Sequence, residues 1–246
     1  MASQGRLLNL GLTAYQDACE VQLRLHEIRA ADQSEDALIL TEHFPVYTLG
    51  RTARPEHVGG SWGQNTINGI PCCVTDRGGS VTYHGPGQVV GYPILALSRY
   101  CAGPKAYIGL LEEVLIRSLA MLAIAGRRHP GMPGVWVENR KIASVGVRIS
   151  RGVTRHGFAL NVTNSLAPFS AVIPCGLVGS AVTSTALESA GEVTLETARR
   201  AVVQAFEEVF DISLLPETGP TALAMAVSHE GFCGDTLNWR AGDGNP

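Results

Sequence analysis

The sequence lacks the residue spacings of a metal site. Its six cysteines form no CxxC pair, and its seven histidines show no HxxxH repeat, so we expect no zinc and no other bound metal. Long hydrophobic runs are also missing, because no segment approaches the roughly 18 apolar residues that span a bilayer. The first residues, Met-Ala-Ser-Gln-Gly-Arg-Leu-Leu, have no continuous apolar stretch and no cleavage site of a secretory signal. We therefore expect a cytoplasmic protein with free thiols that makes no membrane contact.

A strong charge of either sign is absent as well. The net charge of −3 argues against non-specific binding to nucleic acid, which requires a cationic field. Neither phosphate-binding pattern, GxxxxGK[ST] or GxGxxG, occurs, which counts against a nucleotide-dependent enzyme. With 45% hydrophobic and 17% charged residues, the chain has a globular composition. Its length favours one domain over residues 1–215, followed by a weakly patterned extension, residues 216–246, that wraps the surface or is partly mobile.

Three segments have the apolar spacing of amphipathic helices. The first is predicted to begin at Thr13, with Gln16 completing a capping box; the second follows Gly103-Pro104 and stops at Gly126; the third starts at Thr194. Short β-rich runs lie between the helices, at residues 37–41, 46–49, 72–75, 80–83, 89–95, 135–137, 141–149 and 153–162. Because helices and strands do not alternate strictly, we predict an α+β fold with a mixed, largely antiparallel sheet flanked by helices.

The densest motif is the run RGGSVTYHGPGQ, which occupies residues 77–88. Glycines weaken a strand, and their physical use at such a density is the close approach of backbone to a ligand. The alternative interpretation is a pair of tight hairpin turns without a ligand. Arg77 and His84 flank the polar strand between the glycines, so both side chains could face a cleft.

Two further residues are candidates for chemistry. Lys141 follows a predicted hairpin turn and precedes an apolar run, so it lies either at a solvated strand edge or in a cleft, where a buried lysine can act as a base. Cys175 stands between Pro174 and Gly176, which favours a turn that presents the side chain rather than packing it. A nucleophile followed by glycine also offers a backbone N–H to an oxyanion. The other cysteines, such as Cys19 and Cys72, are interpreted as buried apolar residues.

Taken together, the motifs resemble the signature blocks of lipoyl(octanoyl) transferases. The matching segments are RGGSVTYHGPGQVVGYPI, GVWVENRKIASVGVRISRGVTRHGFALNV and IPCGL, with PVYTLGR upstream and VTS downstream as supporting matches. The resemblance covers roughly residues 5 to 212, and it leaves the segment after Pro216 uncovered. It implies a fold like the catalytic module of biotin and lipoate protein ligases.

The resemblance also implies an activity and its site. Members of the family transfer an octanoyl group from acyl carrier protein to a lysine of lipoyl domains, which are found in the E2 subunits of 2-oxoacid dehydrogenases and in the glycine-cleavage H protein. This reaction begins endogenous lipoate biosynthesis and needs no cofactor. By resemblance, Cys175 is the nucleophile and Lys141 activates it. The substrate-binding segments match Arg77, Gly78, Gly79, Ser80, Val81, Thr82, Tyr83 and His84, then Ser144, Val145 and Gly146, then Gly157, Phe158 and Ala159.

Two inferences extend these motifs. Gly78, Gly79, Gly146 and Gly157 would let strand backbones form a narrow slot for the acyl chain. Arg140, Arg148, Arg151 and Arg155 cluster in the sequence around the hairpin, so they form either a docking patch for acidic partner proteins or an ordinary solvated surface. Two rival functions stay open at this point: an ATP-dependent lipoate or biotin ligase, and a non-catalytic module that binds acylated proteins.

Overall fold

A computed structural model describes residues 3–173 and 181–217. In this part of the chain a nine-stranded sheet has the order β13-β1-β2-β7-β11-β10-β9-β8, and β12 pairs with β10 outside that path. The bounds are β1 Ser3–Thr13, β2 Asp36–His43, β7 Gln88–Ile94, β8 Arg127–His129, β9 Met132–Val137, β10 Arg140–Ser150, β11 Val153–Asn161, β12 Ala181–Val182 and β13 Ile212–Pro216. The parallel pairs are β1 with β2, β1 with β13 and β10 with β12, so antiparallel pairing predominates as predicted.

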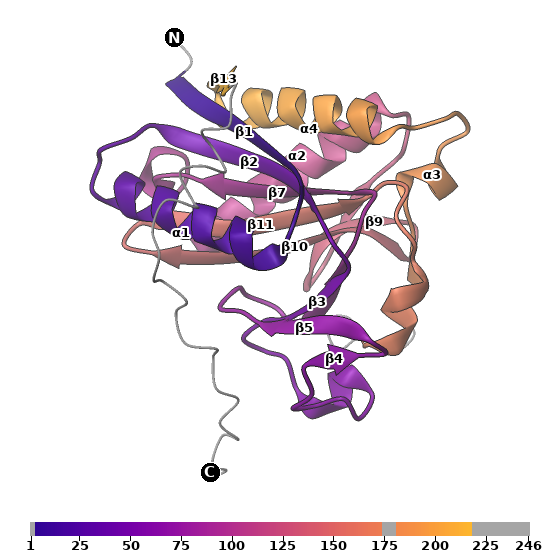
Figure 1. Ribbon diagram of the computed structural model, residues 1–246. Helices are drawn as coiled ribbons and strands as arrows, with labels where there is room; N and C mark the ends of the chain where they lie inside the picture. The colour runs from indigo at the N-terminus through magenta and orange to yellow at the C-terminus, as the bar shows by residue number, and fades with distance from the viewer. Residues whose placement is uncertain (1–2, 174–180, 218–246) are drawn as a thin grey trace.

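A second, smaller sheet lies beyond one end of the first (Figure 1). Its strands are β4 Thr66–Ile67, β5 Ile70–Val74, β3 Val46–Leu49 and β6 Val81–His84, in the order β4-β5-β3-β6. This sheet has its own apolar core, built around Tyr47, Val81 and Phe169. The single sheet expected from the sequence is therefore two sheets, and the segment with the dense glycines passes between them.

The large sheet has helices on both faces. Helix α1 (Tyr15–Ala30) covers one face, where Val21 and Leu25 pack on Ile39 and Val90. Helices α2 (Pro104–Met121) and α4 (Leu195–Phe210) cover the other, where Leu115 and Phe206 join a core with Leu160. Figure 1 shows α1 and the α2–α4 pair on opposite sides of the strands. The short helix α3 (Thr185–Glu188) and the 3₁₀ turns Pro55–Val58, Leu97–Arg99 and Ala167–Ala171 complete the described elements.

The helix boundaries correct two predictions and confirm two, one of which is that α2 follows Gly103 and begins at Pro104. Helix α1 begins at Tyr15 without a side-chain cap, because Thr13 belongs to β1 and its hydroxyl donates to the Leu10 carbonyl instead. Helix α2 ends at Met121, and Ala123 adopts the left-handed conformation that reverses the chain. Gly126 is thus no helix stop: a Cβ there would lie 2.7 Å from Leu119 Cδ1. Thr194 caps α4 as predicted, accepting a hydrogen bond from Thr197 N at 3.1 Å.

No helix in residues 3–173 or 181–217 has the length and apolar character needed to cross a membrane.

Candidate active site

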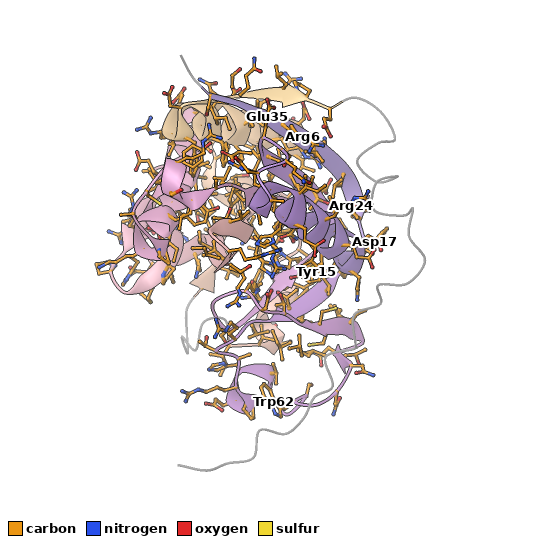
Figure 2. The ribbon with its side chains drawn as sticks, turned by 90° about the vertical axis from the view of Figure 1, so that its left-hand side faces the viewer. Arg6, Tyr15, Asp17, Arg24, Glu35 and Trp62 are labelled. Atoms are coloured by element: carbon orange, nitrogen blue, oxygen red, sulfur yellow. The ribbon has the colours of Figure 1, made fainter. Side chains whose placement is uncertain are left out.

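A cavity that is partly open to solvent lies between the two sheets. The predicted residues that line it are Arg77, Gly79, Ser80, Val81, Thr82, His84, Ser144, Val145, Gly146, Gly157, Phe158 and Ala159. Tyr15, Val90, Tyr92 and His156 also line it, although the sequence did not point to them. Figure 2 shows Tyr15 at the end of α1 that faces the smaller sheet.

Two of the predicted residues lie elsewhere. Gly78 donates its backbone N–H to the Val147 carbonyl at 2.9 Å, which joins the loop before β6 to β10. Tyr83 points into the core of the small sheet, where its ring meets Phe169 edge to face at 5.6 Å. Both residues therefore shape the walls without lining the cavity.

The Arg77 side chain forms hydrogen bonds that connect the glycine-rich loop to strand β3 of the small sheet. Its guanidinium donates to the carbonyls of Thr48 at 2.6 Å, Ser80 at 2.8 Å and Gly78 at 3.0 Å. Because the side chain is buried, these charge-assisted bonds offset the cost of removing the cation from water. The arginine faces the cavity as expected, and it also organises the loop that forms the wall.

The glycines of the predicted slot lie where other backbone segments approach closely. A Cβ at Gly146 would lie 2.8 Å from the Gly78 carbonyl oxygen, and one at Gly157 would overlap the Gly91 carbonyl oxygen. At both residues, neighbouring backbone atoms fill the space that a Cβ would need, so glycine is required whether or not a ligand is bound. Gly79 has φ +84°, which also favours glycine. Gly79, Gly146 and Gly157 line the cavity and Gly78 does not, so a slot for the acyl chain made by these backbones stays a prediction.

A cluster of aromatic and imidazole rings closes one side of the cavity. Tyr15 stacks on His84 with 6.1 Å between ring centroids, and His43 meets His84 at 5.7 Å. His43 is fully buried, with its Nδ1 3.0 Å from the Thr13 carbonyl and its Nε2 2.7 Å from the Tyr92 hydroxyl. Since a carbonyl only accepts, Nδ1 carries the proton and Tyr92 donates to Nε2. Burial lowers the pKa of His43 to about 4 and holds the pKa of His84 well below its usual range, so both rings are neutral at pH 7.

A charged group lies at the edge of the same cavity. Asp76 accepts from His156 Nε2 at 2.8 Å and from Arg155 at 2.6 Å. The hydrogen bond from His156 is the main reason that the pKa of Asp76 lies well below its ordinary value, and burial lowers the pKa of His156 itself. Asp76 is thus bound by two basic side chains next to the cavity, of which His156 lines it.

Lys141 is buried in the large sheet rather than placed at a solvated edge. It pairs with Trp136 of β9 on one side and with Val182 of β12 on the other, and only 5% of it is exposed. Its Nζ lies 5.4 Å from the centroid of the Trp136 ring, within the range of a cation–π interaction. A Cβ at Gly134 would lie 2.7 Å from Lys141 Cε, so this glycine makes room for the lysine stem. Lys141 does not line the cavity between the sheets.

The comparisons with known proteins agree with this architecture. The sequence model of the lipoyl protein ligase A/B catalytic domain matches residues 14–207. The chain belongs to this family. It is 44% identical over 210 residues to an octanoyltransferase of Alkaliphilus metalliredigens, a match that covers 85% of this chain and 96% of the relative. It is 42% identical over 204 residues to an octanoyltransferase of Geobacter metallireducens, covering 82% and 92% of the two chains.

Solved structures of lipoate protein ligases share the fold. The bipartite lipoate protein ligase of Thermoplasma acidophilum superposes with a TM-score of 0.71 at 18% identity, covering 91% of this chain and 90% of that one. Lipoate-protein ligase A bound with ATP gives a TM-score of 0.69 at 17% identity and covers 92% of both chains. At such low identity these likenesses show the fold alone, and they confirm the predicted α+β architecture of a lipoate protein ligase catalytic domain.

The nucleophile expected for this family, Cys175, lies outside the described residues. The described chain approaches that segment at Ile173, whose N–H donates to the His57 carbonyl at 2.8 Å. It resumes at Ala181 and Val182, which pair with Arg140 and Lys141. The segment that contains Cys175 is therefore followed directly by a strand that is hydrogen-bonded to the Lys141 strand. Among the described cysteines, Cys19, Cys72, Cys73 and Cys101 are free thiols.

The arginines of the predicted docking patch do not form one surface. Arg140 lies at the start of β10, where it pairs with Glu188 at 2.9 Å, and Arg148 lies eight residues further along, about 26 Å at strand spacing. Arg148 and Arg155 are opposite each other and share Asp76, and Arg151 lies in the turn after β10. Most of these charges are already paired within the chain. The cluster in the sequence is thus divided between the two ends of a strand.

Proposed function

We propose that this protein transfers an octanoyl group from acyl carrier protein to a lysine of lipoyl domains, through a thioester on Cys175. Octanoyl transfer is the activity by which its curated relatives are named, and those relatives match more than four-fifths of the chain at 42–44% identity. The chain is accordingly an acyltransferase of lipoate biosynthesis. The acyl-enzyme on Cys175, acyl carrier protein as the donor, and the lipoyl domains of E2 subunits and of the glycine-cleavage H protein as acceptors are the finer parts of the proposal.

The observation that carries the proposal is the cavity between the sheets. All three predicted substrate segments contribute to its wall, although they are separated by up to about eighty residues in the chain. Apolar residues, including Val81, Val90 and Phe158, contribute to that wall. Because each buried methylene gains about 0.8 kcal/mol, an eight-carbon chain would gain several kcal/mol there.

The proposed chemistry has two balanced steps. The thiolate of Cys175 attacks the carbonyl carbon of the octanoyl thioester; the new C–S bond forms, the old one breaks, and the carrier thiol leaves with a proton from the Lys141 ammonium, which becomes a neutral amine. In the second step the amine of the target lysine attacks the acyl-enzyme, the C–N bond replaces the C–S bond, and the amine proton passes to Lys141. A nearby ammonium favours a thiolate electrostatically, which is the role of Lys141 in the first step. Thioester exchange is nearly isoenergetic and amide formation is downhill, so we propose no cofactor.

The rival function is an ATP-dependent lipoate ligase, because ligases share the fold. Such an enzyme activates a free acid as an adenylate and needs no cysteine nucleophile. The rival is disfavoured because the ligases match this chain at 17–18% identity, whereas the octanoyltransferases match at 42–44%. Product formation from octanoyl carrier protein without ATP supports the transferase, and a strict requirement for ATP and free acid overturns it.

Intact-protein mass spectrometry tests the proposed intermediate. After the protein is mixed with octanoyl carrier protein, we expect one octanoyl adduct on the full chain. The adduct should be absent from Cys175→Ala and slow to form in Lys141→Ala, while Cys101→Ala, a free cysteine in another part of the fold, serves as the matched control. An adduct that persists in Cys175→Ala refutes the thioester on that residue.

A further inference from the structure

A buried chain of hydrogen bonds connects the cavity to the strand of Lys141. It begins at His84, whose Nδ1 lies 3.1 Å from Gln88 Oε1. The Gln88 amide nitrogen donates to Asn161 Oδ1 at 2.9 Å, and the Asn161 amide nitrogen donates to the Thr183 carbonyl at 2.9 Å. Thr183 N–H then donates to the Lys141 carbonyl at 2.9 Å. All of these side chains are buried, so water cannot replace a lost partner cheaply.

The direction of this chain is determined by backbone carbonyls. The Thr183 carbonyl can only accept, so Asn161 contacts it through the side-chain amide nitrogen, Nδ2. The side-chain oxygen of Asn161, Oδ1, therefore faces Gln88. Gln88 likewise contacts the Tyr83 carbonyl at 3.1 Å through its amide nitrogen. The Gln88 atom that faces His84 is therefore the oxygen, and His84 Nδ1 must carry a proton. Asn164 supports this arrangement, because its amide nitrogen donates to Asn161 Oδ1 at 3.3 Å.

One consequence concerns the ring of His84. Burial keeps the pKa of this histidine well below its usual range, so the ring holds a single proton at pH 7. With that proton on Nδ1, the Nε2 atom has a lone pair. Within residues 3–173 and 181–217, no hydrogen bond is made to this Nε2, and His84 lines the cavity. The ring therefore offers the cavity an acceptor and no donor.

A second consequence concerns β12. This strand has two residues, Ala181 and Val182, and among the described strands it pairs only with β10. The Asn161 amide donates a hydrogen bond to the carbonyl of the next residue, Thr183, and the Thr183 N–H donates one to the Lys141 carbonyl. A two-residue strand has little intrinsic stability, so side-chain hydrogen bonds contribute much of what keeps it against β10.

We propose that Gln88 and Asn161 are positioning residues, which hold His84 in its Nδ1-protonated tautomer and hold β12 against the Lys141 strand, so that the cavity and the lysine keep one relative placement. The proposal rests on the proposed function, because it assigns a catalytic consequence to a placement of Lys141. It predicts that the two amides affect turnover more than affinity for the acyl donor, since neither lines the cavity.

The first test needs no substitution and no activity. In uniformly ¹⁵N-labelled protein at pH 7, the ring nitrogens of His84 should show the shifts of a protonated Nδ1 and an unprotonated Nε2. A His84 ring with its proton on Nε2 overturns the assigned direction of the chain.

The second test uses Asn161→Asp. The new carboxylate still accepts from Gln88 but no longer donates to Thr183, so only the link to β12 is cut. We expect the Thr183 amide to exchange with solvent at least about tenfold faster and kcat to fall by about tenfold or more, with KM for octanoyl carrier protein within about twofold of the parent. Val202→Ala, a buried change in α4 away from this chain, is the control for lost stability and should keep kcat within about twofold.

The outcomes separate this inference from the proposed function. If the parent protein forms the Cys175 adduct and Asn161→Asp lowers only the melting temperature while keeping the parent kcat, the two amides have a structural role and the inference is refuted. If the parent forms no adduct at all, the proposed function fails, and the tautomer of His84 still reports on the hydrogen-bond chain.

Discussion

Acidification should destabilise this protein before its carboxylates begin to titrate, because its buried histidines must stay neutral. His43 is enclosed by Tyr15, His84 and Tyr92, and its Nδ1 donates to the Thr13 carbonyl. A second proton would have to enter Nε2, which already accepts from the Tyr92 hydroxyl. Protonation therefore breaks a buried hydrogen bond and leaves a cation without a counter-charge among these rings.

The magnitude follows from the two pKa values. The pKa of His43 is about 4 in the folded protein because of burial, against 6.5 for an unperturbed histidine. Between these values the unfolded chain binds one more proton than the folded one, so stability falls as the pH is lowered through that window. At 1.36 kcal/mol per pH unit, His43 alone removes about 2 kcal/mol of unfolding free energy between pH 8 and pH 5. His84 and His156 also have lowered pKa values, which adds to the loss.

Urea unfolding from pH 8 to pH 5 measures this effect. His43→Gln keeps a donor and an acceptor near the same two partners but does not titrate, so its stability should fall less steeply with acidification. Tyr92→Phe removes the same hydrogen bond and keeps the buried histidine, so it should be less stable at pH 8 and should still lose stability on acidification, more steeply than His43→Gln. Carboxylates with lowered pKa values, such as Glu113 and Glu188, also contribute to the free energy of unfolding. That contribution is lost only below about pH 4.5, outside the range from pH 8 to pH 5. If the free energy of unfolding falls equally steeply with pH in the parent and in His43→Gln, the reasoning is wrong.

Three other substitutions probe the site. Trp136→Leu removes the ring beneath Lys141 Nζ; a cation–π contact contributes about 0.5–2 kcal/mol, so single-turnover octanoyl transfer should slow by roughly 2- to 30-fold, and an unchanged rate contradicts a role for this contact. Ala159→Val adds bulk to the cavity wall, so competition assays should show a shift in preference from octanoyl toward shorter acyl donors. Unchanged selectivity would show that the acyl chain does not contact this residue. Gly146→Ala should cost about 1–3 kcal/mol of unfolding free energy in urea, because its Cβ meets the Gly78 carbonyl; a variant as stable as the parent refutes that clash.

Local patterns in the sequence were sufficient for much of the fold. Strand β3 has the predicted bounds Val46–Leu49, and the hairpin of β9 and β10 turns at Glu138 and Asn139 as the alternation indicated. Strand β1 was missed, since Gly5, Asn9 and Gly11 interrupt its leucines and lower its apparent β propensity. Its formation depends on β2 and β13, which pair with it from both sides. That tertiary pairing also explains why Thr13 ends a strand instead of capping a helix.

Site residues could be predicted from the sequence where a single segment has an unusual composition. The glycines around Arg77 and His84 indicated a special loop, and both side chains do line the cavity. Tyr15 and Tyr92 were missed because one begins a helix and the other lies in a buried strand, where an aromatic residue has an ordinary packing role. His156 had one usable signal, which is that it precedes Gly157 in a predicted strand; the structure gives His156 a φ of +55°. Gln88 and Asn161 became partners only through the register of β7 and β11.

The close backbone packing at Gly146 limits where specificity for acyl length can reside. Glycine at 146 lets β10 approach the Gly78 carbonyl, and the neighbouring Gly78 N–H then bonds to Val147, so the loop before β6 is joined to the large sheet. The same approach closes the cavity between the two sheets, since residues 79–82 and 144–146 form facing parts of its wall. A larger residue at Gly146 would separate the sheets and damage binding of every acyl length together. Selection between lengths must therefore come from side chains on the cavity face of the strands. Ala159 can change size there without displacing a backbone carbonyl, whereas Val81 packs into the core of the small sheet and Val145 packs against the core beneath α2 and α4.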